Sequence, residues 1–393
     1  MIYRLTGVQR DYAWGSPTAI PQLLGQTPGD DPVAELWFGT HSSGSATVAD
    51  GAPLSDLVDA APEALLGAET VHLHGPQLPY LLKLIAPAQP LSLQVHPNAA
   101  QARRGFDAEE AAGLALDSPA RRYRDRNHKP ELVYAVTRFE ALCGFRAPRR
   151  VLELLAGLDS ALARQLEHVL HRAGPLAGMR AAFDTMLRTG VHDADSIDEL
   201  VAACRARPAE TSPSPRIDRI VAQLGEHYPG DGGAVAPLLL NPVTLEPGET
   251  LFVPPGSLHA YLSGVAVEVM ANSDNVARAG LTAKHVDAEA VIDLVDLNAA
   301  PPMRIAAEPH GPQRTFYAPV DDFELSVLEL SDSVPIPVRG RGPRILLGLS
   351  GSVTIGSWSG SERIGPGQAV FVADSEGELK AAGPGRCVQA AVP

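Results

Sequence analysis

The sequence predicts a mainly β protein that contains two related barrels, with a block of helices inserted into the first barrel. One observation is an imperfect repeat: residues 245–259 and 364–378 each place a Pro-Gly turn before a short apolar strand, at 251–253 and at 370–372. A repeated turn and strand indicates that the chain builds the same β unit twice. The second observation is that residues 148–228, between strand-like segments, keep apolar side chains at helical spacing.

Short apolar runs separated by turn residues occupy the first hundred positions. The runs at 36–39, 81–85 and 91–95 are typical of strands in an antiparallel barrel or sandwich. Near Phe106 the pattern changes, because Asp107 offers a helix cap and is followed by carboxylates suited to a first turn. We therefore expect a short helix near the mouth of the first barrel.

The middle of the chain has the pattern of several helices. Apolar residues three or four positions apart recur in three runs, at 151–158, 161–170 and 179–187. Ser196 and Glu199 match a capping box before another helical run. A glycine-rich break at 228–233 ends the block, and strand-like sequence resumes at 236–240.

These patterns divide the chain into three predicted parts. The first barrel is discontinuous and takes residues 1–147 and 229–300, on either side of an inserted helical domain at 148–228. An Ala-Ala-Pro-Pro segment typical of a linker closes this barrel. Residues 301–393 are expected to form the second barrel, which carries no metal.

Composition and charge narrow the range of partners. The chain has 393 residues, a formal net charge of −14, and no run close to the ~20 apolar residues of a membrane span. The negative charge disfavours binding to nucleic acid. Three widely spaced cysteines, Cys143, Cys204 and Cys387, indicate reduced thiols in a cytoplasmic protein. The sequence thus predicts no membrane or nucleic-acid partner, and it indicates no protein partner.

Four polar residues in or beside apolar strands have the chemistry of a metal site. Gln94 and His96 lie two positions apart in a strand, so their side chains share one face. Glu131 opens another apolar run, and His259 ends the first copy of the repeat. One amide oxygen, two imidazole nitrogens and one carboxylate oxygen suit zinc, and the same ligands also suit manganese, iron or cobalt.

Cysteine is absent from this ligand set, which argues against a purely structural zinc site. One neighbouring residue, His128, is a competing ligand. If Lys129 and Glu131 both face the barrel interior, strand alternation turns His128 away.

The residues that end at His259 resemble the second motif of cupin barrels. They read Pro-x-Gly-x-x-His, and in cupins such a histidine binds a metal. The second copy of the repeat, at 364–378, has no histidine. The resemblance implies cupin-type (jelly-roll) β-barrels, one that binds metal and one that is degenerate.

A wider resemblance covers most of residues 1–290. It is carried by seven stretches, at 12–16, 34–41, 78–83, 91–98, 127–131, 252–261 and 272–284. Together they resemble the type I mannose-6-phosphate isomerases, also called phosphomannose isomerases. The resemblance implies that Gln94, His96, Glu131 and His259 bind one Zn²⁺ per chain, and that the chain interconverts mannose 6-phosphate and fructose 6-phosphate. The second barrel is only weakly matched.

An aldose–ketose isomerisation moves a proton between C1 and C2 through an enediolate, so it needs a base and a group that stabilises negative charge. Glu268 is one candidate base, because it is a carboxylate in an apolar strand and burial raises the pKa of such a group. Lys129, two positions from Glu131, is the other candidate. Arg278, in a loop with Asn272, offers a planar fork for an oxyanion or a phosphate.

Five further residues are candidates for binding the substrate. Ser92 shares a strand face with Gln94, where its hydroxyl is placed to donate to a phosphate oxygen. Lys83 and Lys284 would complete a basic pocket. Trp14 and Tyr261 are expected to stack against the sugar or hydrogen-bond to it, although a core role is equally expected for Trp14.

Two alternative functions remain open at this point. One is another cupin enzyme, such as an oxidoreductase or a different metal isomerase. Gln94 stands where iron cupins commonly have a histidine, and this substitution disfavours oxygen activation. The other is a non-catalytic cupin that binds a sugar phosphate, which aldose–ketose turnover would distinguish from an enzyme.

Overall fold

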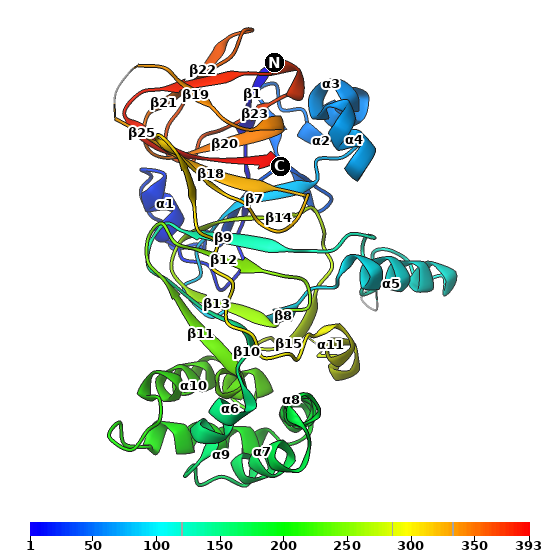
Figure 1. Cartoon of the computed structure of the whole chain (residues 1–393), viewed down its shortest axis with the longest axis vertical. Coiled ribbons are helices and arrows are strands. Elements are labelled where there is room, and N and C mark those ends of the chain that lie inside the picture. The colour runs from blue at the N-terminus through cyan, green and yellow to red at the C-terminus, as the bar shows by residue number, and fades with distance from the viewer. Residues whose placement is uncertain (119–120, 285, 332–333) are drawn as a thin grey trace.

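The computed structural model describes residues 1–118, 121–284, 286–331 and 334–393. Its elements are stacked along one long axis, with a group of helices at one end followed by two pairs of β-sheets (Figure 1). The predicted fold class, mainly β barrels with a helical insertion, is confirmed by this arrangement.

Two facing antiparallel sheets form the first barrel. The five-stranded sheet contains, in spatial order, β11 (Leu240–Leu245), β10 (Phe139–Phe145), β13 (His259–Ser263), β8 (Leu93–Val95) and β15 (Ala277–Gly280). The six-stranded sheet contains β12 (Thr250–Val253), β9 (Glu131–Ala135), β14 (Ala266–Ala271), β7 (Tyr80–Ile85), β3 (Glu35–Phe38) and β2 (Val8–Arg10). Buried side chains such as Val133, Phe139 and Val243 fill the space between the two sheets. A short ladder of β4 (Thr40–His41) and β5 (Gly44–Ser45) lies beside them.

Two more facing sheets form the second barrel. The eight-stranded sheet contains, in spatial order, β16 (Glu308–His310), β17 (Gln313–Phe316), β18 (Glu324–Leu330), β25 (Gly385–Val392), β20 (Arg341–Gly351), β23 (Ala369–Val372), β1 (Ile2–Thr6) and β6 (Thr47–Val48). The four-stranded sheet contains β19 (Ile336–Val338), β24 (Leu379–Ala382), β21 (Val353–Gly356) and β22 (Ser361–Ile364). Leu328, Leu346 and Ile355 belong to the core between them.

A third apolar layer joins the two barrels. Leu82 and Leu84 of the six-stranded sheet share one buried cluster with Leu325, Ile345 and Leu347 of the eight-stranded sheet. Because strand side chains alternate, each of these sheets has one face toward its own barrel and the other toward this shared layer. The shared layer leaves both sheets covered on both sides.

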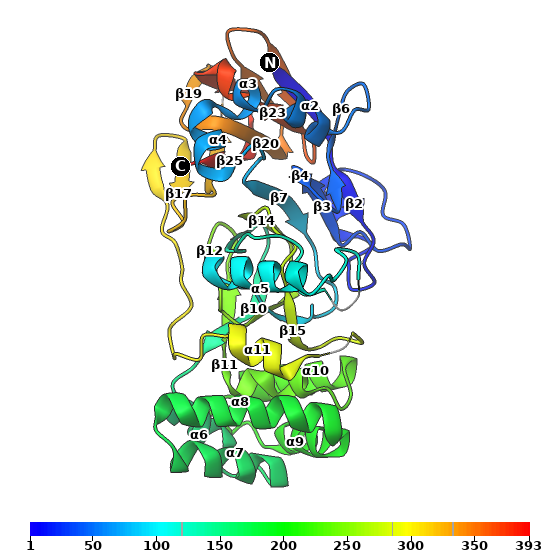
Figure 2. The same ribbon diagram turned by 90° about the vertical axis from the view of Figure 1, so that its right-hand side faces the viewer.

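A helical block packs on the outer face of the five-stranded sheet (Figures 1 and 2). It consists of α6 (Pro148–Leu155), α7 (Ala161–Arg172), α8 (Pro175–His192), α9 (Ala194–Ala206) and α10 (Pro215–His227), followed by the 3₁₀ helix η1 (Gly232–Leu238). Phe183 of α8 meets Phe145 of β10 edge-on, with ring centroids 5.2 Å apart. The strand expected at 236–240 is therefore mostly 3₁₀ helix, because Pro237 and its neighbours lie in the buried connection to the sheet.

The remaining helices are short and lie around the barrels. They are α1 (Ala19–Leu23), α2 (Leu54–Ala60), α3 (Pro62–Leu66), α4 (Ala68–His74), α5 (Ala99–Ala111), α11 (Ala288–Leu294) and the 3₁₀ helix η2 (Asp374–Glu376). None of the helices in the described part of the chain has the length and apolar character needed to cross a membrane.

Two helix starts differ from the sequence prediction. Helix α5 begins at Ala99 with a capping box between Asn98 and Gln101, so Asp107 lies inside the helix. Helix α9 begins at Ala194, and its cap is Asp193, whose side chain accepts a hydrogen bond from the Ser196 backbone at 3.2 Å. In both cases an Asn or Asp a few residues upstream caps the helix, because its short side chain reaches the first free backbone N–H groups.

The division of the chain at residues 147, 228 and 300 stays a prediction, and the first segment contributes two strands, β1 and β6, to the eight-stranded sheet of the second barrel. Strand β1 pairs with β23 of the second barrel, from Ile2 opposite Val372 to Leu5 opposite Ala369. Residues at the extreme N-terminus thus fill an edge that the C-terminal strands would leave open.

The two copies of the repeat have the same place in their barrels. After β12 the chain crosses to β13 in the facing sheet, and after β23 it crosses through η2 to β24 in the facing sheet. His259 is the first residue of β13. The first copy of the repeat therefore ends on a histidine at the start of a strand, with its side chain directed into the first barrel.

The contact between the barrels can be tested at Tyr80, a fully buried residue of β7. Its hydroxyl lies 3.0 Å from the carbonyl oxygens of both Pro343 and Ala390 in the second barrel. We predict that Tyr80→Phe lowers the free energy of unfolding by about 1–3 kcal/mol, because a buried carbonyl loses its donor. Chemical denaturation would measure this change. The matched control is Tyr317→Phe, since Tyr317 is exposed; equal effects of the two substitutions would contradict the prediction.

Candidate metal centre and active site

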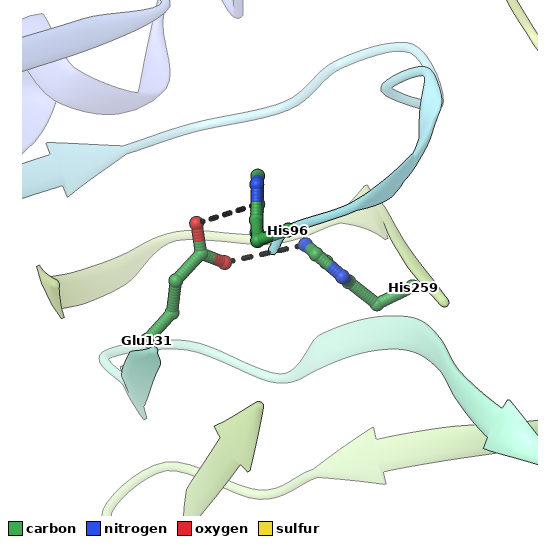
Figure 3. A group of neighbouring side chains, drawn as sticks. All are labelled: His96, Glu131 and His259. Atoms are coloured by element: carbon green, nitrogen blue, oxygen red, sulfur yellow. Dashed lines mark ion pairs between the residues drawn. The ribbon is translucent and has the colours of Figure 1, made fainter. Parts of the chain in front are cut away.

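Three buried residues from both sheets of the first barrel converge on one point. Figure 3 shows the Glu131 carboxylate, which extends from β9, facing the imidazoles of His96 and His259. His96 Nε2 lies 3.2 Å from Glu131 Oε1, and His259 Nε2 lies 3.2 Å from Glu131 Oε2. One donor atom from each residue lies within 4.8 Å of the others, which is the spacing of ligands around a single ion.

Hydrogen bonds fix which nitrogen of each histidine faces this point. His96 Nδ1 lies 2.8 Å from the Asn275 carbonyl oxygen, and His259 Nδ1 lies 3.0 Å from the Ser257 carbonyl oxygen. A carbonyl accepts only from a protonated Nδ1, so each Nε2 keeps its lone pair free for a metal. Burial, with Lys129 nearby, lowers the pKa of His96 to about 4, which keeps its ring neutral.

Among the three candidate ligand atoms, His96 Nε2 gives the clearest sign that a metal binds here. His96 is 1% exposed, and within the described residues its Nε2 has no hydrogen-bond partner. Its 3.2 Å contact with Glu131 lacks hydrogen-bond geometry. An unpartnered buried nitrogen is costly unless something binds it. Two neutral imidazoles and a carboxylate therefore fit a divalent metal such as zinc.

Gln94 lies beside this group. In the five-stranded sheet it pairs with His259 on one side and with Arg278 on the other, so the three side chains lie in a row on one face. Its amide nitrogen donates to Ser92 Oγ at 3.1 Å. This bond leaves the Gln94 amide oxygen available as a fourth metal ligand.

Two further groups hold the Glu131 carboxylate. The Tyr261 hydroxyl donates to Glu131 Oε2 at 2.9 Å, and Lys129 Nζ lies 3.3 Å from Glu131 Oε1. Burial alone would raise the pKa of Glu131, but Lys129 and the two histidines outweigh it and hold the pKa well below its usual range. Glu131 is therefore a permanent carboxylate, which is the form that binds metal.

The six-stranded sheet contributes a second row across β14, β7 and β3. Glu268 pairs in register with Lys83, and Lys83 pairs with Trp37. Both charged groups are buried, and Lys83 Nζ lies 2.9 Å from Glu268 Oε2. Burial raises the pKa of Glu268, with Glu131 adding to the effect. Against the opposing effect of burial, Glu268 and its carboxylate neighbours raise the pKa of Lys83 and keep it protonated.

A cavity of about 490 Å³ joins the two rows. Its walls include every site residue predicted from the sequence except His96, which lies behind Glu131: Trp14, Lys83, Ser92, Gln94, Lys129, Glu131, His259, Tyr261, Glu268, Arg278 and Lys284. The partly buried Trp14 stacks on Tyr12 at 5.6 Å. The competing ligand candidate, His128, does not join the metal group, because its Nε2 lies 2.8 Å from Asp322 Oδ2.

The cavity opens toward a basic mouth. Arg278 and Lys284 also line an adjoining cavity of about 870 Å³, together with Arg121, Arg122 and Arg124. Burial lowers the pKa of Arg278, although nearby Asp274 opposes this shift. Arg121 is paired with Glu109 and Glu110, and Arg122 with Asp287. Among the described residues Arg124, Arg278 and Lys284 form no ion pair, and these charges would attract an anionic substrate despite the overall negative charge.

Sequence reasoning missed some residues of the cavity wall. His41 lines it, and burial lowers the pKa of His41 to about 4. Glu35 lines it as well and accepts a hydrogen bond from Trp37 Nε1 at 2.5 Å. Both belong to the stretch 34–41, which carried the family resemblance without a role for any residue. Their polar side chains within or beside an apolar strand were the signal that pointed to them.

The sequence of this chain is similar to those of known proteins. Residues 2–148 match the family model described as "Phosphomannose isomerase type I, catalytic domain". The mannose-6-phosphate isomerase of Escherichia coli is 38% identical over 98% of this chain and 97% of its own length. Mannose-6-phosphate isomerase 1 of Arabidopsis thaliana is 31% identical over 96% of this chain and 90% of its own.

Solved structures agree with the sequence relatives. A crystal structure of mannose 6-phosphate isomerase bound with zinc and yttrium superposes with a TM-score of 0.90 at 33% identity, over 100% of this chain and 99% of that chain. The apo form from Salmonella typhimurium superposes with a TM-score of 0.90 at 34% identity and the same coverage.

The metal centre can be tested through Tyr261 without removing a ligand. We predict that Tyr261→Phe lowers zinc affinity about 10–100-fold, because Glu131 loses the hydrogen bond that orients it. Competition with a chromophoric chelator would measure the affinity. Tyr228→Phe is the control, since Tyr228 also lines the cavity but donates to the Pro90 carbonyl oxygen. An unchanged affinity in Tyr261→Phe would remove this role.

Proposed function

This chain belongs to the type I phosphomannose isomerases, and from that premise we propose how its own residues interconvert mannose 6-phosphate and fructose 6-phosphate. The observation that carries the proposal is the cavity of about 490 Å³ between the two sheets, because it is lined from both of them. One wall presents the pair of Glu268 and Lys83, and the other presents His259, Gln94 and Arg278. A six-carbon sugar phosphate placed there would meet a base, the metal position and a phosphate-binding group at the same time.

The cofactor is one Zn²⁺ per chain. We propose that His96 and His259 hold it through Nε2, and that Glu131 and Gln94 hold it through side-chain oxygens, which the free nitrogens and the permanent carboxylate support. When bound, it supplies a Lewis acid that polarises a substrate oxygen at C1 or C2.

We assign the proton transfer between C2 and C1 to Glu268. Lys83 holds one of its carboxylate oxygens, which fixes the group on the cavity wall and leaves the other oxygen to accept the C2 proton. The raised pKa of Glu268 suits a base that must also give the proton back at C1. A proton delivered to C1 after one is taken from C2 leaves the overall oxidation level of the sugar unchanged, and the proton held on Glu268 between these steps can exchange with solvent.

Lys129 is the rival base, and the structure supports a different role for it. Its ammonium lies 3.3 Å from Glu131 Oε1, beside the position of the metal. We propose that it moves the hydroxyl proton between O1 and O2 while Glu268 moves the carbon-bound proton. A positioned ammonium also stabilises the developing enediolate charge.

The phosphate is assigned to the basic mouth of the cavity. Arg278, Lys284 and Ser92 line the cavity and provide a planar fork, an ammonium and a hydroxyl. Trp14 offers a ring face to the sugar. Tyr261 offers its ring, since its hydroxyl is already bonded to Glu131.

The composition of the chain and the burial of its cysteines support proposals for its location and its partners. We propose a cytoplasmic location, supported by three free and buried cysteines, Cys143, Cys204 and Cys387. We propose that the physiological ligand is the hexose phosphate and that neither nucleic acid nor a membrane is a partner; no protein partner is indicated. The net charge of −14 supports the absence of nucleic acid.

The decisive experiment is conversion of mannose 6-phosphate to fructose 6-phosphate by the purified full chain. Activity should disappear with a chelator and return with added zinc, because the Lewis acid is removed and restored. A coupled assay of fructose 6-phosphate would measure it. A folded, zinc-loaded protein without turnover would favour a sugar-phosphate-binding cupin or a different cupin enzyme.

The assignment of the base gives a separate prediction. Glu268→Gln should lower kcat by about 10²–10⁴-fold and suppress exchange of the C2 proton with solvent, because the amide cannot accept a proton. Proton NMR in deuterated water would follow the exchange. Lys129→Met is the comparison: if exchange persists in Glu268→Gln and is lost in Lys129→Met, the base is Lys129.

The role of Arg278 is tested against another arginine. Arg278→Met should reduce kcat/KM by about 10²–10³-fold, because a charged donor to the substrate is lost. Arg104→Met is the matched control, since Arg104 is exposed on α5. Steady-state kinetics would compare the two, and similar losses would remove the proposed role.

A further inference from the structure

The second barrel has a polar end of its own. Along strands β17, β18, β20 and β25, successive side chains point alternately toward the shared layer and toward the interior of the second barrel. Leu328, Leu346 and Cys387 point toward the interior. Every second residue from them along the same strand therefore points there as well. At one end of the barrel these inward positions are polar and buried: Gln313, Thr315, Glu324, Ser326, Arg344 and Gln389. A barrel retained only for packing needs no such layer.

Part of this layer is self-contained. Gln313 Nε2 donates to Ser326 Oγ at 3.0 Å, and the Thr315 and Ser326 hydroxyls lie 2.9 Å apart. Gln313 Oε1 accepts from the Arg339 backbone at 2.8 Å. These groups satisfy one another's hydrogen-bonding capacity, so this part of the polar end needs no further partner.

Arg344 is not satisfied in the same way. It is 0% exposed, and within the described residues no carboxylate lies at ion-pair distance from its guanidinium. Two of its nitrogens donate to backbone carbonyls, Nη1 to Gly340 at 3.1 Å and Nη2 to Gly377 at 2.5 Å. Its Nε is buried without any hydrogen-bond partner in the described chain. Burial lowers the pKa of Arg344, and the more distant carboxylates of Asp374 and Glu376 oppose this shift without cancelling it. A buried cation with no directly paired carboxylate is unfavourable.

Glu324 has the complementary property. It is 7% exposed, and among the described residues it forms no hydrogen bond or ion pair. Burial raises the pKa of Glu324 to about 7, so near neutral pH its carboxyl is available both to accept and to donate a hydrogen bond.

Arg344 and Glu324 line the same cavity, which has a volume of about 1050 Å³. Residues of helix α4 form one wall, and the end of β25 with the C-terminal residue forms another. Figure 2 shows α4 beside the C-terminus of the chain. Its rim carries both signs of charge, with Arg339 and Arg341 on one hand and four carboxylates on the other, Glu69, Asp321, Asp374 and Glu378, so Arg344 is the buried positive charge at the inner end of the cavity. Among the described residues, none that lines this cavity also lines the catalytic one.

We propose that this cavity of the second barrel binds a small polyhydroxylated molecule with one anionic group, held by its anion on Arg344 and by a hydroxyl on Glu324. The planar guanidinium matches a carboxylate or a phosphate, which would supply the missing counter-charge. The Glu324 carboxyl matches a hydroxyl, which a purely inorganic anion lacks. The site is independent of the metal and of the isomerase chemistry.

The test is calorimetric binding of two probes to the full chain: D-gluconate, which carries a carboxylate, and glycerol 3-phosphate, which carries a phosphate. At least one should bind, and Arg344→Met should weaken that binding about tenfold or more, because a charge-assisted hydrogen bond is lost. The probe that responds identifies the anion class.

Two controls separate this site from others. Arg314→Met removes an arginine of the same barrel that pairs with Glu329, and it should leave binding unchanged. Arg278→Met removes the phosphate-binding arginine of the catalytic cavity; a probe whose binding is lost in Arg278→Met and kept in Arg344→Met is bound in the catalytic cavity and overturns the proposal. The proposal is overturned if neither probe binds at millimolar concentration, or if Arg344→Met binds as tightly as the parent chain.

A second variant covers the case in which Arg344→Met does not fold. Glu324→Gln keeps the side-chain shape and should weaken binding of the same probe, because the amide replaces the carboxyl that meets its hydroxyl. A crystal structure of the full chain with the probe then decides. A probe bound at Arg344 supports the site, and a probe found only in the catalytic cavity overturns it.

Discussion

The first barrel is organised around one buried carboxylate. Glu131 comes from the six-stranded sheet, whereas His259 and Tyr261 come from the facing sheet, and all three meet at hydrogen-bond or ligand distance. A carboxylate this deeply buried is stable only when partners surround it, so the two sheets must face each other in one register. Within each sheet, strand pairing places Arg278 next to Gln94 and Glu268 next to Lys83. The chemistry of the cavity therefore depends on the same contacts that hold the sheets together.

The layers outside the barrel keep that register in place. The helical block covers the five-stranded sheet, where Phe183 packs against Phe145 of β10. The second barrel covers the six-stranded sheet, where Tyr80 reaches the carbonyl oxygens of Pro343 and Ala390. A functional barrel whose two sheets are each supported from outside can hold charged groups in its interior without collapsing around them. This gives both flanking units a physical role in the activity, although neither contributes a residue to the metal group.

The two barrels stabilise their buried charges in different ways. In the first, two neutral imidazoles and a permanent carboxylate form a set that a divalent metal completes. In the second, the repeat has lost its histidine, and the buried charges are the Glu376 carboxylate, which pairs with the N-terminal ammonium, and the Arg344 cation, which has no paired carboxylate among the described residues. The loss of metal ligands removed one chemistry from the second barrel. It left an inward-facing polar layer whose unpartnered Arg344 nitrogen calls for an anion rather than a metal.

By itself, the sequence determined the fold class, the helical block and most of the polar residues that line the active cavity, although not Glu35 or His41, because strand alternation and local spacing are short-range properties. Gln94 and His96 share a strand face for that reason. The tertiary structure alone decided which groups pair across strands. The bond of Lys83 to Glu268, the contact of His128 with Asp322, and the pairing of β1 with β23 join residues far apart in the chain. No local pattern records such contacts, because they arise only when the sheets close and each buried charge must find its partner.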